Sequence, residues 1–536
     1  MLQRKRCFVR MWMIFGVVLM MFPWVFPGIT GEEKHEIKFP SYGDGTPVVM
    51  SNPYSEKITT LRNETGKQSN PTPTSPPGLT PENNNWGQYM KDFYRSGRYL
   101  TAYDLFGGTN PYRLTSAAVR ASPIMLHKEE SGDSLCIPKI NGDPVYYCTI
   151  IGDDSGWITA VITREILYSY RWQIQPQIIS PISSFAASNS IESSSLFWVA
   201  TKGGGQSVYP VLEVRRTYNG QKPCPDPSKC TIIFGTPNAR IITPLLYLPG
   251  GGGGGIIEDR VYVVVEYPNT QQMTLYAYTL ATPPAQIVLR WSRTFTLFSS
   301  PNLLALQRNN EPRPIIMSFP DAAGTIMMLS EVNGATLAYT QAGAPVVASP
   351  SIDTYTWGYL YVPAADGRIR KYDINIAYVF NLLWTSQDFT PTPKIKSIFS
   401  SIANHQSALY VAIHNGYNNY QYGRVKFLSI NKNDGSVIWA SQPILSYPST
   451  LPAIYASPAV TLKYVFFVAM GPDDSNSGSW YELSISDGSI MHTRWGLDSG
   501  QYTETSTVIS RVDAASDLAF ALTGATNKAA GIGYQQ

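Results

Sequence analysis

A short Ser-Pro or Ser/Thr element recurs along this chain, each time directly before an apolar run. Examples are "VASPSIDT" and "YASPAVTL". The eight elements contain Ser122, Ser180, Thr243, Ser300, Ser349, Ser401, Ser457 and Ser506, at intervals of 49 to 63 residues. A near-regular period of this size is typical of repeat proteins, in which each unit packs mainly against its neighbours. The chain is therefore expected to fold as a series of eight similar units.

Each repeat has the same internal order. After the Ser-Pro strand come a second apolar strand, a third strand introduced by glycine, and a fourth strand that ends on an aromatic residue. The glycine precedes a tryptophan by 16 or 17 residues in four repeats, at Gly156 and Trp172, Gly367 and Trp384, Gly423 and Trp439, and Gly478 and Trp495. Tyr339 is expected at the tryptophan's place in one further repeat, and Trp291 closes a repeat that lacks the glycine. Each unit therefore reads as a four-stranded antiparallel meander.

Hairpin turns at 332–335, 433–436 and 486–489 carry Asn-Gly or Asp-Gly, which supply positive φ angles. A single small sheet cannot bury both of its faces, but sheets packed radially can, as they do in a β-propeller. We expect an all-β fold, an eight-bladed β-propeller with seven blades as the alternative, in which the tryptophans fill the space between blades. The last repeat is short, so the segment 97–106 is expected to complete its blade.

The N-terminus indicates export. Arg4, Lys5, Arg6 and Arg10 flank an uncharged apolar run over residues 11–29, whose length suits either a cleaved signal peptide or a retained signal-anchor. Residues 1–31 are assigned to this segment. Residues 32–85 form a stalk rich in Pro, Ser, Thr and Asn that cannot bury enough apolar surface to fold. Residues 86–536 form the propeller, which is expected outside the cytosol, either secreted or tethered to a membrane through residues 11–29.

The cysteine content agrees with an oxidising compartment. Beyond Cys7, the chain has four cysteines, and proximity favours disulfides between Cys136 and Cys148 and between Cys224 and Cys230. Asn63 begins a glycosylation sequon in the stalk. The net charge is +3 and no basic block follows the N-terminus, so nucleic acid is not expected as a partner.

The segments 349–374 and 457–470 resemble the PQQ-like repeat, the blade unit of the quinoprotein alcohol dehydrogenase-like propellers. The resemblance covers most of residues 86–536. It implies a propeller fold, and its members include both quinone-dependent dehydrogenases and scaffolds without a cofactor. The dehydrogenases carry a disulfide between adjacent cysteines and a calcium site. This chain has no adjacent cysteines and no evident set of calcium ligands, which argues against dehydrogenase activity.

Candidate binding residues occupy the loops between the second and third strands, which share one rim of a propeller with the connections between blades. They are Asp153, Asp154, Asp321, Asp366, Asp473 and Asp474, with Tyr417, Tyr420 and Tyr422 in the loop "HNGYNNYQYG". Carboxylates can bind a cation, although aspartate is also a common turn residue. Tyrosine and asparagine are common on recognition surfaces. No catalytic or metal-binding motif is evident.

The sequence therefore predicts an exported, non-catalytic scaffold that uses no cofactor and binds a protein or a glycan. The alternative is a PQQ-dependent oxidoreductase that also requires calcium.

Overall fold

The computed structural model describes twenty ranges of the chain. They are residues 121–127, 147–162, 165–171, 182–188, 196–217, 220–250, 258–296, 300–306, 312–353, 358–374, 378–389, 398–415, 423–441, 444–446, 457–461, 463–470, 478–494, 508–511, 519–525 and 528–534. All of these lie in the second of two units, Gln68–Gln536, and only this unit is described below. The predicted export segment, stalk, Asn63 and residues 97–106 lie outside the described ranges.

The first four sheets cover residues 124–341. Sheet 1 contains β1 (Ile124–His127), β2 (Tyr147–Gly152), β3 (Trp157–Ile162) and β4 (Glu165–Arg171), and sheet 2 contains β5 (Ile182–Ser188), β6 (Leu196–Thr201), β7 (Val211–Arg216) and β8 (Thr231–Ile233). Sheet 3 contains β9 (Leu246–Leu248), β10 (Arg260–Tyr267), β11 (Gln272–Ala281) and β12 (Gln286–Phe295), and sheet 4 contains β13 (Asn302–Ala305), β14 (Ile315–Ser318), β15 (Thr325–Leu329) and β16 (Thr336–Gln341).

The other four sheets cover residues 351–534. Sheet 5 contains β17 (Ser351–Ile352), β18 (Tyr359–Ala364), β19 (Arg368–Asp373) and β20 (Asn381–Thr385), and sheet 7 contains β27 (Ala459–Val460), β28 (Tyr464–Met470), β29 (Gly478–Ser484) and β30 (Ile490–Arg494). Sheet 6 contains β21 (Ile398–Phe399), β22 (Ala403–His405), β23 (Ala408–Asn415), β24 (Gly423–Asn431), β25 (Val437–Ala440) and β26 (Ile444–Ser446), and sheet 8 contains β31 (Val508–Arg511), β32 (Ala519–Ala525) and β33 (Lys528–Tyr534).

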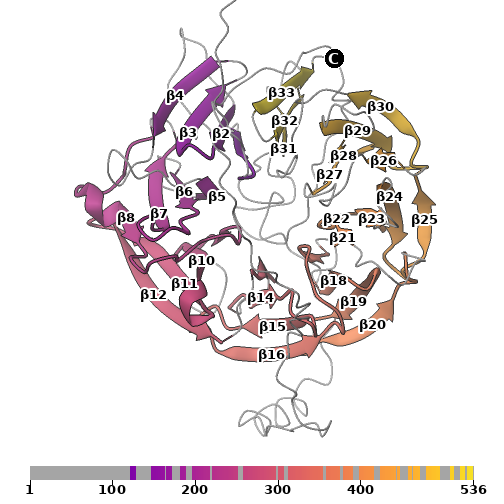
Figure 1. The fold of residues 1–536 in the computed structure, drawn as a ribbon, viewed down its shortest axis with the longest axis horizontal. Coiled ribbons are helices and arrows are strands. Elements are labelled where there is room, and N and C mark those ends of the chain that lie inside the picture. The colour runs from indigo at the N-terminus through magenta and orange to yellow at the C-terminus, as the bar shows by residue number, and fades with distance from the viewer. Residues whose placement is uncertain are drawn as a thin grey trace, which may run out of the picture. The chain divides into compact units, whose positions relative to one another are not determined.

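All strand pairs are antiparallel neighbours in sequence, apart from the split first and fourth strands of sheet 6. Strand β1 contacts β5 and also β31, so the first and last sheets are adjacent in the ring that Figure 1 shows. This arrangement is the predicted all-β propeller, and each sheet is one blade. Eight sheets are present in the described ranges, while the blade number of the whole chain stays a prediction. Helix in these ranges is limited to η1 (Pro227–Cys230) and η2 (Pro268–Thr270), and neither could span a membrane.

A Ser-Pro element lies directly before the innermost strand of seven sheets. In sheet 6, whose innermost strand is split, Ser401 lies between the two parts, β21 and β22. A strand begins two residues after seven of the eight elements, and three residues after Thr243. In the described residues several of these elements also join neighbouring blades. The Thr243 hydroxyl donates to the Pro301 carbonyl at 3.0 Å, and the Ser349 amide donates to Ser401 Oγ at 3.1 Å. The hydroxyl groups therefore link innermost strands that belong to different sheets.

The hydrophobic core lies between the blades. The middle strands β6 and β10 are almost entirely buried, because both of their faces are covered by neighbouring sheets. The outermost strands are more exposed, as in β20, where four of the five residues are exposed. Aromatic pairs such as Phe427 and Phe467, with ring centroids 4.1 Å apart, join one blade to the next.

The recurring tryptophan closes the gap between neighbouring blades as predicted. Trp291 donates from Nε1 to the Glu331 carbonyl at 2.9 Å and lies over Gly334 in the next blade. Two further tryptophans repeat this arrangement: Trp384 bonds to the Lys432 carbonyl and lies over Gly435, and Trp439 bonds to the Ile485 carbonyl and lies over Gly488. The same turn that begins a fourth strand therefore also receives the indole of the preceding blade.

A tyrosine accompanies each of these tryptophans. Tyr262, Tyr361 and Tyr410 lie on the second strand in the same row as Trp291, Trp384 and Trp439, with ring centroids 5.8, 6.1 and 6.0 Å apart. The tryptophan follows a β-bulge in the fourth strand, which adds one unpaired residue. Bulged residues at this place occur in six sheets: Leu167, Arg290, Leu337, Leu383, Ile438 and Met491.

The predicted place of the aromatic residue was wrong in sheet 4. Counted from the bulge, that place holds Ala338 rather than Tyr339 in sheet 4, and Tyr339 is 68% exposed. Sheets 1 and 7 hold Tyr168 and His492 there, while Trp172 and Trp495 lie outside the described residues. The third strands differ in length, so a count from their first glycine drifts. In sheets 4, 6 and 7 this place lies four residues after the turn glycine, whereas the turns before Trp291 and Trp384 have no glycine at that distance.

The predicted hairpin turns are confirmed, with one correction to their backbone geometry. Only the glycine of each turn has a positive φ angle, 72° at Gly334, 75° at Gly435 and 71° at Gly488. The preceding Asn333, Asp434 or Asp487 instead accepts a hydrogen bond at Oδ1 from the backbone amide two residues on, at 2.9 to 3.0 Å. The acidic or amide residue therefore stabilises the turn through its side chain.

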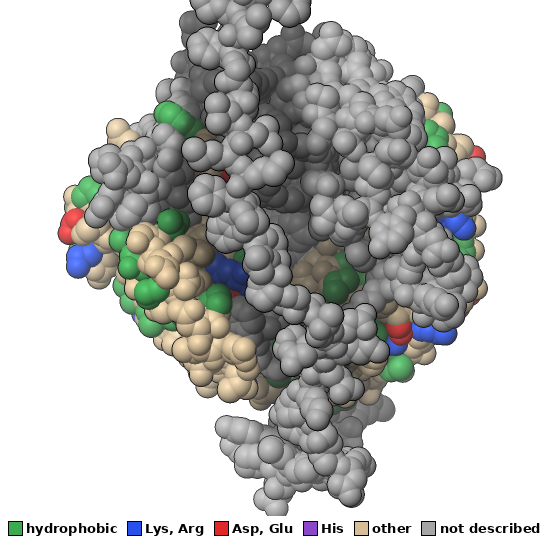
Figure 2. Space-filling view, viewed as in Figure 1, with side chains coloured by type: hydrophobic (Ala, Val, Ile, Leu, Met, Phe, Trp, Pro, Cys, Tyr) green, Lys and Arg blue, Asp and Glu red, His purple; other side chains and the backbone are tan. Residues whose placement is uncertain are grey.

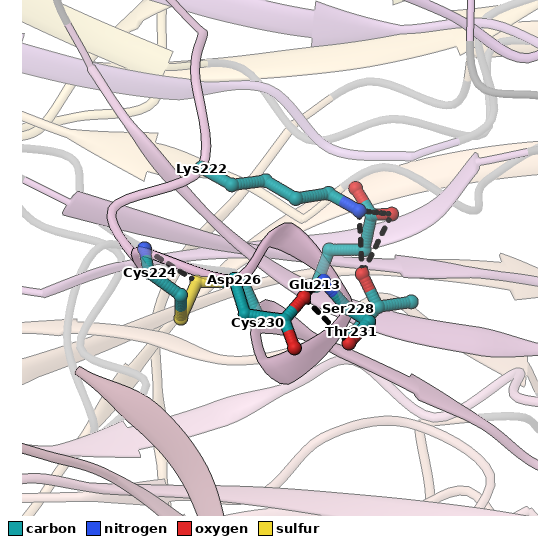
Figure 3. The surroundings of a disulfide bond; sticks show 7 residues. All are labelled: Glu213, Lys222, Cys224, Asp226, Ser228, Cys230 and Thr231. Atoms are coloured by element: carbon teal, nitrogen blue, oxygen red, sulfur yellow. Dashed lines mark hydrogen bonds and ion pairs between the residues drawn. A yellow bond between two sulfur atoms is a disulfide. The ribbon is translucent and has the colours of Figure 1, made fainter. Parts of the chain in front are cut away.

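Sheet 2 uses a disulfide where other blades use a short turn (Figure 3). The predicted bond between Cys224 and Cys230 is present in the connection from β7 to β8. Both cysteines are buried in a hydrophobic cluster with Tyr278 of sheet 3, and η1 contacts β12. Glu213 supports the loop through ion pairs with Lys222 at 3.0 Å and Arg215 at 2.7 Å. The disulfide loop thus fills the gap between blades 2 and 3.

Candidate functional site

The loops between second and third strands lie on one face of the propeller, because each meander reverses direction at every turn. Asp153 occupies this loop in sheet 1 and is 1% exposed. Its Oδ1 accepts hydrogen bonds from Ser155 N at 3.0 Å, Ser155 Oγ at 2.8 Å and Trp157 N at 3.0 Å. The carboxylate therefore holds its own hairpin in shape. Asp154, beside it, is half-buried.

Asp321 and Asp366 hold equivalent hairpins in sheets 4 and 5. Asp321 accepts from the backbone amide and the hydroxyl of Thr325, both at 2.7 Å. Asp366 accepts from the Arg368 amide at 3.2 Å and forms an ion pair with Arg370. The structure thus places these aspartates in separate blades, each bonded within its own turn. Within the described ranges, no three acidic, cysteine or histidine side chains gather closely enough to hold one metal ion.

Apart from Cys148, the remaining predicted site residues lie outside the described part of the chain. These residues are Cys136, Tyr417, Tyr420, Tyr422, Asp473 and Asp474. The flanking strands show that residues 416–422 and 471–477 each connect a second strand to a third strand. Cys148 lies on β2, paired in register with Leu126 of β1.

A second feature of this face was not predicted. Three segments from sheets 2 and 3 are joined by β-bridges, in which Gly203 pairs with Arg240 and Arg240 pairs with Glu266. The Arg240 and Glu266 backbones exchange hydrogen bonds of 3.0 and 2.8 Å, and Ile241 N donates to the Lys202 carbonyl at 2.8 Å. We call the loops 202–210, 234–242 and 267–272, together with the adjoining Glu266, the platform.

The side chains of the platform reinforce its backbone pairing. Arg240 Nε lies 2.7 Å from Glu266 Oε2, and the Glu266 side chain is almost fully buried. The Ser300 hydroxyl, at the entry to sheet 4, donates to the other oxygen of this carboxylate. Asn238 Nδ2 donates to Asn269 Oδ1 at 3.3 Å across the two blades. Three blades therefore meet at one buried, fully bonded carboxylate.

Gly203 is required by this geometry. Its φ angle is +67°, and a Cβ atom there would lie 2.5 Å from Pro210 Cδ and 2.7 Å from the Ala239 carbonyl oxygen. A side chain would separate the loops, so the platform depends on glycine at this position.

The outer surface of the platform is polar and nearly uncharged. Its exposed residues are Lys202, Gly204, Gln206, Ser207, Gly235, Thr236, Pro237, Ile242, Asn269, Thr270, Gln271 and Gln272, of which Ile242 is the one large aliphatic side chain. Figure 2 likewise shows mostly uncharged surface over β10–β12 on the face in view. Amide and hydroxyl groups dominate, so the surface can donate and accept hydrogen bonds with little net electrostatic field.

Sequence reasoning missed the platform because its three segments are about 30 residues apart in sequence, as Gly203, Arg240 and Glu266 show. The one signal was Glu266 itself, a carboxylate in the otherwise apolar stretch "VYVVVEY". A buried charge requires a partner, but nothing in the sequence identifies Arg240 as that partner.

No protein-family model matches the chain, and no curated protein matches its sequence. Solved structures do match its fold. Sqt1 from Saccharomyces cerevisiae aligns with a TM-score of 0.52 and 9% identity, covering 80% of this chain and 98% of that one. BamB from Moraxella catarrhalis aligns with a TM-score of 0.44 and 12% identity, covering 79% and 99%.

A quinohemoprotein alcohol dehydrogenase from Comamonas testosteroni aligns with a TM-score of 0.38 and 10% identity, covering 84% of this chain and 80% of that one. At these identities the likeness concerns the fold alone, and it agrees with the β-propeller described above.

Proposed function

We propose that this chain is an exported, non-catalytic propeller of PQQ-like repeats that binds a protein or a glycan through its platform. The observation that carries the proposal is the bridged set of loops around Arg240 and Glu266. Backbone hydrogen bonds and an ion pair hold these exposed loops together, so a ligand would have less chain to order, which lowers the free-energy cost of association. Their neutral amide and hydroxyl groups suit recognition by directional hydrogen bonds.

The neighbouring loops of the same face extend this surface. We include Asp154, Asp473 and Asp474, with Tyr417, Tyr420 and Tyr422, as further candidate contacts. Asp153, Asp321 and Asp366 act by keeping their hairpins in shape, because their oxygens bond within their own turns. A ligand that spans several blades would reach both groups.

Export rests on the N-terminal segment and on the Cys224–Cys230 disulfide, which is typical of oxidising compartments. Deleting residues 1–31 should leave the protein in the cytosol with these cysteines reduced. Delivery outside the cytosol without the segment would contradict this part of the proposal. Whether the mature protein keeps residues 11–29 as a tether is decided by sequencing its N-terminus.

The binding proposal is tested by capture with matched variants. The platform variant is the exported domain with Gln206→Arg and Thr236→Arg, which replaces two exposed platform residues. A control carrying Thr282→Arg and Ser292→Arg adds the same charge to exposed residues of sheet 3 outside the platform, one in the turn between β11 and β12 and one on β12. A binder retained by the wild type and the control, but lost from the platform variant, supports the proposal. Equal recovery with all three proteins overturns it.

The oxidoreductase alternative has its own test. PQQ and Ca²⁺ are added to the purified protein, and reduction of an artificial electron acceptor by alcohols is measured. We expect no quinone-dependent turnover. Alcohol-dependent reduction that requires both additions would overturn the non-catalytic assignment.

A further inference from the structure

The bulged residues of the fourth strands form a surface outside the platform. A β-bulge leaves one residue unpaired and redirects its side chain. In three successive blades this residue is apolar and exposed to nearly the same extent, with exposed fractions of 50% for Leu383, 48% for Ile438 and 47% for Met491. We call these three residues the bulge row. The equivalent residue in sheet 3 is Arg290, so apolar character is not required by the fold.

The tryptophan contacts connect the blades that carry the bulge row. Trp384, next to Leu383, lies over Gly435, three residues before Ile438. Trp439, next to Ile438, lies over Gly488, three residues before Met491. Exposed Leu382 and Ile490 enlarge the apolar surface at its two ends. Neighbouring members are therefore held at a fixed separation by the same contacts that pack the blades.

Acidic groups alternate with the apolar ones. Asp434 and Asp487 each precede a bulged residue by four positions and are fully exposed. Hydrogen bonds from Ser436 and Ser489 hold the pKa of each carboxyl below its usual value, so both stay ionised at neutral pH. The equivalent residue in sheet 4 is the neutral Asn333. Apolar and acidic residues therefore alternate from one blade to the next, in the order Leu383, Asp434, Ile438, Asp487 and Met491.

We propose that the bulge row is a docking surface for an extended protein segment in which apolar residues alternate with lysine or arginine. The apolar side chains would cover Leu383, Ile438 and Met491, and the cations would pair with Asp434 and Asp487. The chain carries a net charge of +3, so its overall field does not attract cations and any such attraction must be local.

The test uses a fluorescein-labelled peptide of alternating leucine and lysine, titrated with the exported domain while fluorescence anisotropy is measured. Peptides of alternating leucine and glutamate, and of serine and lysine, are the controls. We expect measurable binding of the Leu/Lys peptide and much weaker binding of both controls. Equal binding of the Ser/Lys peptide would show that charge alone explains the binding of the Leu/Lys peptide, and it would overturn the proposal.

Variants locate the binding. Asp434→Asn with Asp487→Asn should weaken binding about fivefold, and the effect should fade at high salt. Asparagine keeps the turn, because Asn333 already accepts the same hydrogen bond in sheet 4. Leu383→Ser with Ile438→Ser should weaken binding about tenfold. Leu289→Ser, which removes an exposed apolar residue from β12, should have no effect.

Two outcomes would overturn the proposal even if the peptide binds. One is an unchanged affinity in the bulge-row variants, with their melting temperatures showing intact folds. The other is self-association: if sedimentation shows that the wild type dimerises and Ile438→Ser abolishes the dimer, a second copy of this chain covers the surface instead.

Discussion

Trp439 lies directly on Gly488 of the next blade, so closely that a Cβ atom on this glycine would be 2.3 Å from Cε3 of the indole. The backbone of Gly488 also has a φ angle of +71°, which side chains other than glycine rarely tolerate. The indole Nε1 donates to the Ile485 carbonyl at 2.9 Å in the same turn. One turn thus fixes both a hairpin and the spacing of two blades.

Gly488→Ala should therefore destabilise the propeller by about 1–3 kcal/mol, through overpacking against the indole and through backbone strain. Urea unfolding followed by tryptophan fluorescence measures this change. Gly235→Ala is the matched control, because nothing lies within 4 Å of its Cβ position. A loss in the Gly235 variant as large as that in Gly488→Ala would show that the indole contact is not the cause.

The buried ion pair between Arg313 and Glu331 makes a second stability prediction. Arg313 Nη2 lies 2.9 Å from Glu331 Oε1, and both side chains are at most 2% exposed. Removing one charge leaves the other buried without its partner, so Glu331→Gln should lower the free energy of unfolding by about 3–5 kcal/mol. The double variant Arg313→Met, Glu331→Leu should recover much of that loss. A double variant as unstable as the single one would contradict this explanation.

The Cys224–Cys230 disulfide should stabilise the gap between blades 2 and 3. Replacing both cysteines by serine is expected to lower the free energy of unfolding by about 2–3 kcal/mol, from the loop-closure term for a loop of this length. Thermal unfolding with and without a reductant measures it. Peptide mapping of non-reduced protein should also show the predicted Cys136–Cys148 bond. Free thiols at all four positions in exported protein would refute the compartment assignment.

Tyr410 gives a prediction for alkaline pH. Burial raises the pKa of its hydroxyl to about 12, above the ordinary value of 10.0. The folded state therefore keeps this proton to a higher pH than the unfolded state does. The stability that the protonated hydroxyl of Tyr410 contributes is complete below pH 10 and is lost as the pH rises from about 10 to 12. Phenylalanine does not titrate, so the free energy of unfolding of Tyr410→Phe should fall by about 1 kcal/mol less than that of the wild type between pH 8 and pH 11. Identical pH profiles for the two proteins would contradict the assignment.

Much of the fold could be predicted because each blade repeats its local chemistry. A Ser-Pro element precedes the innermost strand in seven sheets and lies within the split innermost strand of sheet 6, and the Asp-Gly and Asn-Gly turns lie where the sequence placed them. The tryptophan positions were harder, because the bulge determines them and has no clear sequence signature. Ala338, rather than Tyr339, therefore occupies the place of the tryptophan in sheet 4.

The candidate site was less predictable for a different reason. Asp153, Asp321 and Asp366 were correctly placed in their loops, but the sequence left open whether their oxygens face a ligand or their own turns. The platform depends on Gly203, Arg240 and Glu266, which come from different blades and meet only in the folded ring. Contacts of this kind arise from tertiary structure, so no local pattern indicates them.

The central claim is that the platform binds the partner, and an affinity measurement tests it most directly. The partner recovered by capture is purified and titrated calorimetrically into the wild type, the Gln206→Arg, Thr236→Arg variant and the Thr282→Arg, Ser292→Arg control. We predict that the platform variant loses about tenfold or more in affinity, as expected when central contact residues are changed, while the control keeps the wild-type Kd. The same Kd for all three proteins would contradict the claim.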